Sequence, residues 1–88
     1  MEDAKTIIQL TREFNQVTTK LAMVNTVRSH LFTEITSFKD LLARCYSVEL
    51  ANIIEDLSAI YNTTGCMAIE MAQMKDVIEG QIYISRHR

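Results

Sequence analysis

The sequence contains no proline and no tryptophan, and it has glycine only at positions 65 and 80 of its 88 residues. Proline and glycine form most tight turns, so their scarcity excludes collagen-like chains and turn-rich β folds. An apolar fraction of 48% is too high for a disordered chain. The composition therefore predicts an all-α protein, and the length predicts one small helical domain over residues 1–88.

Long hydrophobic runs and an excess of positive charge are also missing. No apolar run exceeds four residues, as at 21–24, which is far too short to span a membrane. The acidic N-terminus lacks the apolar core of a signal peptide. Nine Lys and Arg against eleven Asp and Glu leave a net charge of −2, without the basic stripe that duplex nucleic acid requires. We expect a cytoplasmic protein with neither membrane nor duplex nucleic acid as a partner.

Residues that carry chemistry are few. Cys45 and Cys66 lack metal-ligand spacing and a secretory context, so we expect them to be reduced, small core residues. His30 and His87 form no metal pair, and no glycine-rich phosphate loop or nucleophile motif occurs. The sequence thus predicts no enzyme, no cofactor and no metal site.

What the sequence does contain is an apolar seam at helical spacing, interrupted once by Arg28. Such a seam predicts a helix that packs along its length against another helix. A buried guanidinium cannot lose its charge and costs several kcal/mol unless it is paired or meets an anion. Arg28 is therefore either a structural pin that fixes register or a ligand contact. The apolar positions alternate by three and four residues: Ile7, Leu10, Phe14, Val17, Leu21, Val24, Leu31, Ile35, Phe38, Leu42 and Cys45.

The expected fold is a long two-helix hairpin with its turn near residues 45–48. The first helix runs from about residue 3, with Asp3 as its N-cap, to about residue 46; the second starts at an N-cap, Ser47, and ends near Ile84. The hydroxyl-rich stretches 33–37 and 62–65 are possible kinks or loops, which would give three or four helices, and Ser37 with Asp40 resembles a capping box. We favour continuous, bent helices because the helical spacing of the apolar residues continues through both stretches. Inward residues of the second helix are expected to be Leu50, Ile53, Ile54, Leu57, Ile60, Tyr61, Met67, Ala68, Met71, Met74, Ile78 and Ile82.

Apolar residues also lie off the main seam, and a lone hairpin cannot cover them. This predicts a homo-oligomer, an oligomeric helical bundle of coiled-coil type. Five methionines fit either ordinary core packing or adaptable packing at an interface. The off-seam residues of the first helix are Ile8, Val27, Phe32 and Leu41.

Folding the chain about residues 46 and 47 brings together residues whose numbers sum to about 93. Arg28 then faces Gly65, with Asn25, Thr26 and Thr64 close by. This cluster of a guanidinium, an amide and hydroxyls would hold waters, a buried structural network or a small anion.

Two short stretches resemble a known family. Asn25-Thr26-Val27-Arg28 is similar to an Asn-Ala-Ile-Lys-like segment, and Thr64-Gly65-Cys66-Met67-Ala68-Ile69 to a Thr-Gly-Phe-Met-Ala-Leu segment. Both belong to small helical phage proteins that sequester cyclic oligonucleotides and so blunt CBASS defence. The resemblance implies that Arg28 contacts phosphate and that Phe14 takes the place of an upstream tyrosine. Where the family has a basic residue after the second stretch this chain has Glu70 and Met71, which puts a second ligand site in doubt.

Together these features predict a non-enzymatic, phage-type accessory or anti-defence protein. It would sequester an anionic, nucleotide-like signalling ligand, such as a cyclic nucleotide, in the host cytoplasm. The alternative is a protein–protein interaction module, an inhibitor or adaptor that binds a host protein through an apolar helix face. The predicted ligand-binding residues are Arg28, Asn25, Thr26, Thr64 and Phe14.

Overall fold

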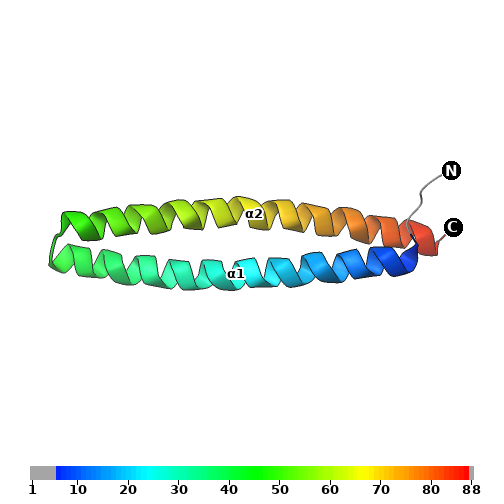
Figure 1. Cartoon of the computed structure of the whole chain (residues 1–88), viewed down its shortest axis with the longest axis horizontal. Helices are drawn as coiled ribbons and strands as arrows, with labels where there is room; N and C mark the ends of the chain where they lie inside the picture. The colour runs from blue at the N-terminus through cyan, green and yellow to red at the C-terminus, as the bar shows by residue number, and fades with distance from the viewer. Residues whose placement is uncertain (1–5, 88) are drawn as a thin grey trace.

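The computed structural model describes residues 6–87 and consists of two antiparallel helices, α1 (Ile7–Arg44) and α2 (Val48–Arg86). They lie side by side along a rod of 64 × 20 × 14 Å, and the first residue of α1 and the last residue of α2 are at the same end of it (Figure 1). This confirms the predicted all-α hairpin and the position of its turn.

Each helix begins at a polar cap. The backbone N–H of Gln9 donates to the Thr6 hydroxyl at 3.1 Å, and the Thr6 N–H donates to Gln9 Oε1 at 3.0 Å, which makes a capping box. Ser47 caps α2 by accepting from the Leu50 N–H at 3.3 Å, as predicted. The expected cap Asp3 lies outside the described residues. The described chain has no positive φ, so the connection between the helices needs no glycine.

Both hydroxyl-rich stretches remain helical, so the possibility of three or four helices is wrong, and Ser37 with Asp40 does not start a helix. The threonine hydroxyls in these stretches donate to carbonyls of their own helix, one turn earlier. A hydroxyl bound in this way does not compete for the backbone and form a turn. The bonds run from Thr33 to Ser29, from Thr36 to Phe32, from Thr63 to Ala59 and from Thr64 to Ile60.

The predicted seam of α1 is the face that packs on α2. Every seam position from Leu10 to Leu42 is buried or partly buried, including Arg28. Ile7 and Cys45, at the two ends of the seam, are exposed, because the partner helix no longer covers them. The most buried apolar residues are Leu10, Val17, Ile35, Ile54 and Ile78, and Leu10, Val17 and Ile78 form a cluster with Phe14, Met71 and Ile82.

The expected inward face of α2 is wrong at four positions. Ile53, Ile60, Met67 and Met74 are 40–54% exposed. Large apolar residues occupy two neighbouring stripes of α2. The stripe that packs on α1 also contains small side chains, so apolar character alone does not show which stripe is buried. Cys45 and Cys66 are exposed as well, which contradicts their expected place in the core. The small, partly buried residues are Ala51, Ser58, Gly65 and Ala72.

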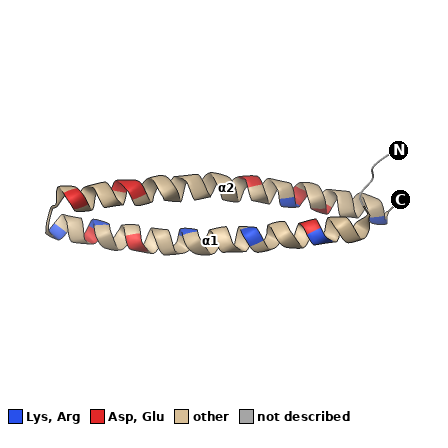
Figure 2. Cartoon of the chain, viewed as in Figure 1, with Lys and Arg blue, Asp and Glu red and all other residues tan. Residues whose placement is uncertain are grey.

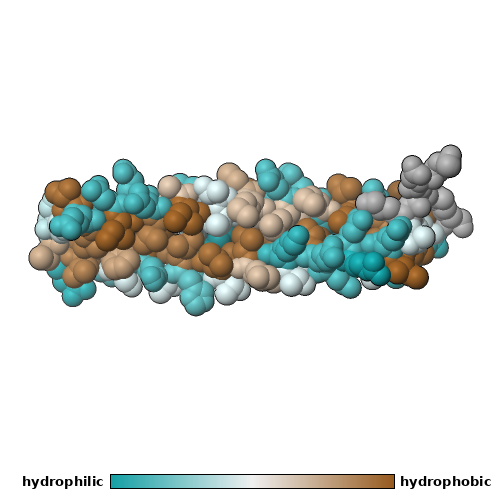
Figure 3. Space-filling view, viewed as in Figure 1, coloured by the Kyte–Doolittle hydropathy of each residue, from teal (hydrophilic) through white to brown (hydrophobic). Residues whose placement is uncertain are grey.

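Much of the apolar surface stays uncovered in the single chain. Sixteen large apolar side chains of the described residues are exposed, Met23 among them. Figure 3 shows apolar surface running along both helices from the turn towards the middle of the rod. Neither α1 nor α2 combines the length and the apolar character that a membrane crossing requires.

Candidate functional site

The Arg28 side chain crosses from α1 to α2. Its guanidinium carbon lies over the ring of Tyr61, 4.1 Å from the ring centroid, which is a close cation–π contact. A Cβ placed on Gly65 would be 2.9 Å from Arg28 Nη2. The facing of Arg28 and Gly65 that the hairpin register predicts is therefore present, and glycine leaves the space that the guanidinium occupies.

One donor of the Arg28 guanidinium has no acceptor among residues 6–87. Its Nε is buried without a hydrogen-bond partner. No carboxylate of residues 6–87 forms an ion pair with Arg28. A charged donor that gives up water without gaining an acceptor costs about 1–3 kcal/mol or more. Arg28 is thus held by packing and by an aromatic face, and its Nε–H stays unsatisfied.

An open groove of about 560 Å³ adjoins Arg28, and we call it the Arg28 groove. Its volume is within the range of small-molecule sites. Phe32, 59% exposed, lies with its ring centroid 6.2 Å from that of Tyr61, so two aromatic rings border the groove next to the guanidinium. The lining residues are Asn25, Arg28, Ser29, Phe32 and Thr33 of α1 and Tyr61 of α2.

Arg28 is an isolated charge. In the facing stretches 21–33 and 57–69 it is the single Lys, Arg, Asp or Glu residue (Figure 2). The nearest carboxylates along α1 are Glu13 and Glu34, and along α2 they are Asp56 and Glu70. The middle of the hairpin therefore combines one uncompensated positive charge with a polar and aromatic groove, a combination that suits an anion with a planar part.

Comparison with known proteins assigns the chain to no family. No family model, curated protein or solved structure matches the chain.

Two of the five predicted site residues, Arg28 and Asn25, line the groove together. Thr26 is exposed and borders a different depression, next to His30, while its hydroxyl donates to the Ala22 carbonyl at 3.0 Å. The Thr64 hydroxyl donates to the carbonyls of Ile60 and Tyr61, so it is bound within α2.

Phe14, the aromatic that the resemblance implies, lies far from Arg28. Fourteen residues of helix separate them, about 21 Å along the axis. Phe14 packs against the Leu10 cluster, and the Lys75 ammonium lies 5.5 Å from its ring centroid. The groove takes its aromatic rings from Phe32 and Tyr61 instead. The sequence carried a signal for both, because Tyr61 is inward on α2 and Phe32 is off the seam of α1, but their meeting at Arg28 was not predicted.

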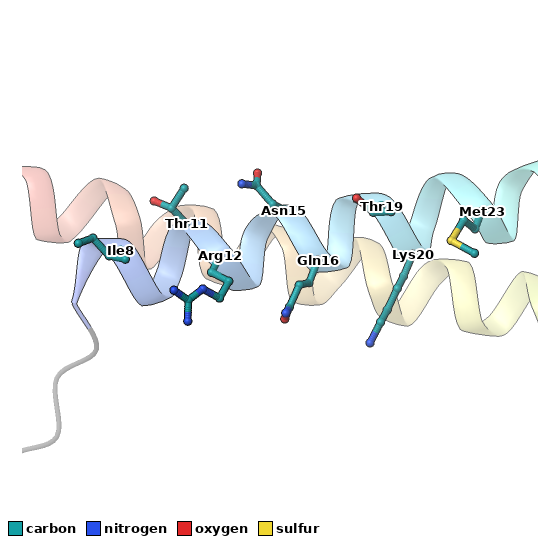
Figure 4. A pocket seen from close by; sticks show the side chains of 8 residues that line it. All are labelled: Ile8, Thr11, Arg12, Asn15, Gln16, Thr19, Lys20 and Met23. Atoms are coloured by element: carbon teal, nitrogen blue, oxygen red, sulfur yellow. The ribbon is translucent and has the colours of Figure 1, made fainter.

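A larger depression, of about 750 Å³, lies on the outer side of α1 (Figure 4). All of its lining residues, from Ile8 to Met23, belong to α1, so a ligand there would touch one helix only. Arg12 and Lys20 border this strip, but no aromatic side chain does. The Arg28 groove is the stronger candidate, because two helices contribute to it.

Alanine substitution tests the close contact between Arg28 and Gly65, and Gly80 provides the control. Gly80→Ala should stabilise the fold by about 1 kcal/mol, because alanine favours the helix and nothing lies within 4 Å of the new methyl group. Gly65→Ala should gain less than this or lose stability, because the methyl group displaces the guanidinium. Urea unfolding of the two variants measures the difference. Equal stabilisation by both would show that Arg28 moves freely.

Proposed function

We propose that this protein is a non-enzymatic binding protein that sequesters an anionic, nucleotide-like ligand in the Arg28 groove. The observation that carries the proposal is the Arg28 guanidinium, which no carboxylate of residues 6–87 neutralises, in one groove with the aromatic rings of Phe32 and Tyr61. Phosphate oxygens accept the paired hydrogen bonds that a guanidinium donates. A nucleobase that stacks on an aromatic ring contributes about 1–3 kcal/mol.

The ligand class that we favour is a cyclic nucleotide. The support for this choice is the resemblance of residues 25–28 and 64–69 to the phage proteins that sequester such ligands, together with the position of Asn25 and Arg28 in one groove. A protein of this type would act in the host cytoplasm as an anti-defence accessory. It would bind its signalling ligand without altering it.

A thermal-shift panel of cyclic dinucleotides and trinucleotides tests the proposal. A ligand at 100 times its Kd should stabilise the fold by about 2.7 kcal/mol. Inorganic phosphate and an uncharged nucleoside are the controls. Each should give a smaller shift, because phosphate has no base that can stack and the nucleoside has no negative charge. Chromatography of the released ligand should show it unchanged. Absence of any shift across the panel at millimolar ligand would contradict a cyclic-nucleotide site.

A second candidate function is favoured by the exposed apolar stripe of α2, which contains Ile53 and Ile60. A module that docks a helix face onto a host protein would use such a stripe. This function requires the stripe to be free in solution, as it would be in a monomer of 10.1 kDa. Light scattering separates this candidate from a protein whose stripe is covered by a copy of itself.

A further inference from the structure

Six of the sixteen large apolar side chains that are exposed among residues 6–87 lie on one side of the hairpin. The α1 seam keeps the same spacing along its whole length, so residues seven apart keep the same position beside it. Glu13 of α1 lines a depression together with Met74 and Gln81 of α2, which puts the stripes that contain them on the same side. We call this side the Val27 face. Its residues are Glu13, Lys20, Val27, Glu34 and Leu41 of α1 and Ile53, Ile60, Met67, Met74 and Gln81 of α2.

The Val27 face lies on the opposite flank of the seam from the Arg28 groove, which Asn25 and Phe32 border. Six of its ten residues are large and apolar, and all six are 40–54% exposed. The two charged residues in its central part are Lys20 and Glu34, and neither forms an ion pair within residues 6–87. Glu13 lies nearer one end of the face, so its centre is apolar with one pair of opposite charges, a composition that suits helix packing.

The exposed area of the chain exceeds what its size requires. The chain exposes 6647 Å², whereas a compact monomer of this mass exposes about 5,300 Å². The difference is larger than the roughly 800 Å² that each partner buries in an interface of standard size. A partner that buries about 800 Å² on one side of this rod would bring the exposed area of each chain closer to the compact value.

The charges indicate which chain provides this cover. Lys20 precedes Val27 by seven residues, and Glu34 follows it by seven. If two copies meet with antiparallel helices about a two-fold axis at Val27, Lys20 of each copy lies opposite Glu34 of the other. The hairpin register places Met67 level with Val27, so the same axis passes Met67. Ile60 of each copy then lies opposite Met74 of the other. A parallel arrangement would instead place Lys20 against Lys20 and Glu34 against Glu34.

We propose that the Val27 face is the interface of an antiparallel homodimer, in which two hairpins form a four-helix bundle. The two Arg28 grooves are then on the outer flanks and remain open to solvent. This inference goes beyond the proposed function and does not depend on it, because none of the residues that line the groove takes part in the interface.

Multi-angle light scattering tests the dimer, and apolar substitutions in the full chain locate its interface. The unmodified chain should have about twice its monomer mass at micromolar concentration. Met67→Asp places two carboxylates at the axis and should give a helical monomer. Ile69→Asp is the matched control, on the same helix but outside the Val27 face, and it should remain dimeric. A monomeric unmodified chain, or a Met67→Asp variant that stays dimeric, would overturn the proposal.

Charge exchange tests the register without touching the apolar residues. Lys20→Glu and Glu34→Lys each bring like charges together twice per dimer, so each should weaken dimerisation by about tenfold. The double variant restores both opposite-charge pairs and should recover the affinity of the unmodified chain. An affinity in the double variant no better than in the single variants would contradict the antiparallel register.

Discussion

Replacing Arg28 by methionine should abolish ligand binding while the hairpin stays folded. The substitution removes the charge-assisted hydrogen bonds to phosphate, each worth about 1.5–3 kcal/mol, so two of them correspond to a loss of at least about 100-fold in affinity. Isothermal titration with the ligand from the thermal-shift panel measures the loss. Arg12→Met is the control, because Arg12 lies outside the groove on the outer strip of α1 (Figure 4).

The stability of the same variant separates a ligand contact from a structural pin. The methionine side chain reaches as far as the Nε position of arginine and leaves no unsatisfied donor there, which should compensate for the lost cation–π contact of about 0.5–2 kcal/mol. We therefore expect the free energy of unfolding to stay within about 1 kcal/mol of the original value or to rise.

If Arg28 were instead a pin in a satisfied network, Arg28→Ala would cost about 3–5 kcal/mol, because its partners would be left unpaired. Urea unfolding of both Arg28 variants decides between these outcomes. An Arg28→Met variant that is folded and binds the ligand with full affinity would rule out the groove as the ligand site.

The largest loss of stability should come from Leu10→Ala. Leu10 is 3% exposed and packs with Val17 and Ile78, so the substitution leaves a cavity at the centre of their cluster. Such changes cost about 2–5 kcal/mol, a large share of the 5–15 kcal/mol that typically holds a protein folded. Ile8→Ala removes similar atoms from a side chain that is 72% exposed and should cost less than about 0.5 kcal/mol.

Thermal and urea unfolding at one fixed protein concentration compare the two variants, since association also contributes to stability. Similar losses for Leu10→Ala and Ile8→Ala would mean that the surface around Ile8 is covered in solution. In that case the buried cluster would extend beyond the single hairpin.

The course of α1 was predictable because one stripe of apolar residues continues at seam spacing along the whole helix. Every third or fourth residue from Leu10 to Leu42 is inward, and Arg28 stands out as the one charge among them. On α2 the same reasoning chose Ile53 and Met67, which are exposed, because small residues such as Ala51 and Gly65 complete the buried stripe. Periodicity identifies apolar stripes, but it does not say which of two stripes another helix covers.

The candidate site was predictable only at its centre. A guanidinium in an apolar seam is unusual in the sequence itself, and the register of the hairpin places Gly65 opposite to it. The contact with Tyr61 depends on the direction of the long arginine side chain, which reaches α2 about one turn away from its own level. Phe32 belongs to the site because its ring contacts the ring of Tyr61, and helical spacing does not predict a contact of this kind.

The short connection at residues 45–47 has a consequence for the order in which the hairpin assembles. Residues near Leu42 and Leu50 meet after closing a small loop, whereas Leu10 and Ile82 are separated by most of the chain. The entropy lost on closing a loop rises with its length, so pairing should start at the connection and progress like a zipper towards the chain ends. The tightest packing, around Leu10, would then form last, and it would keep the two helices from separating at that end of the hairpin.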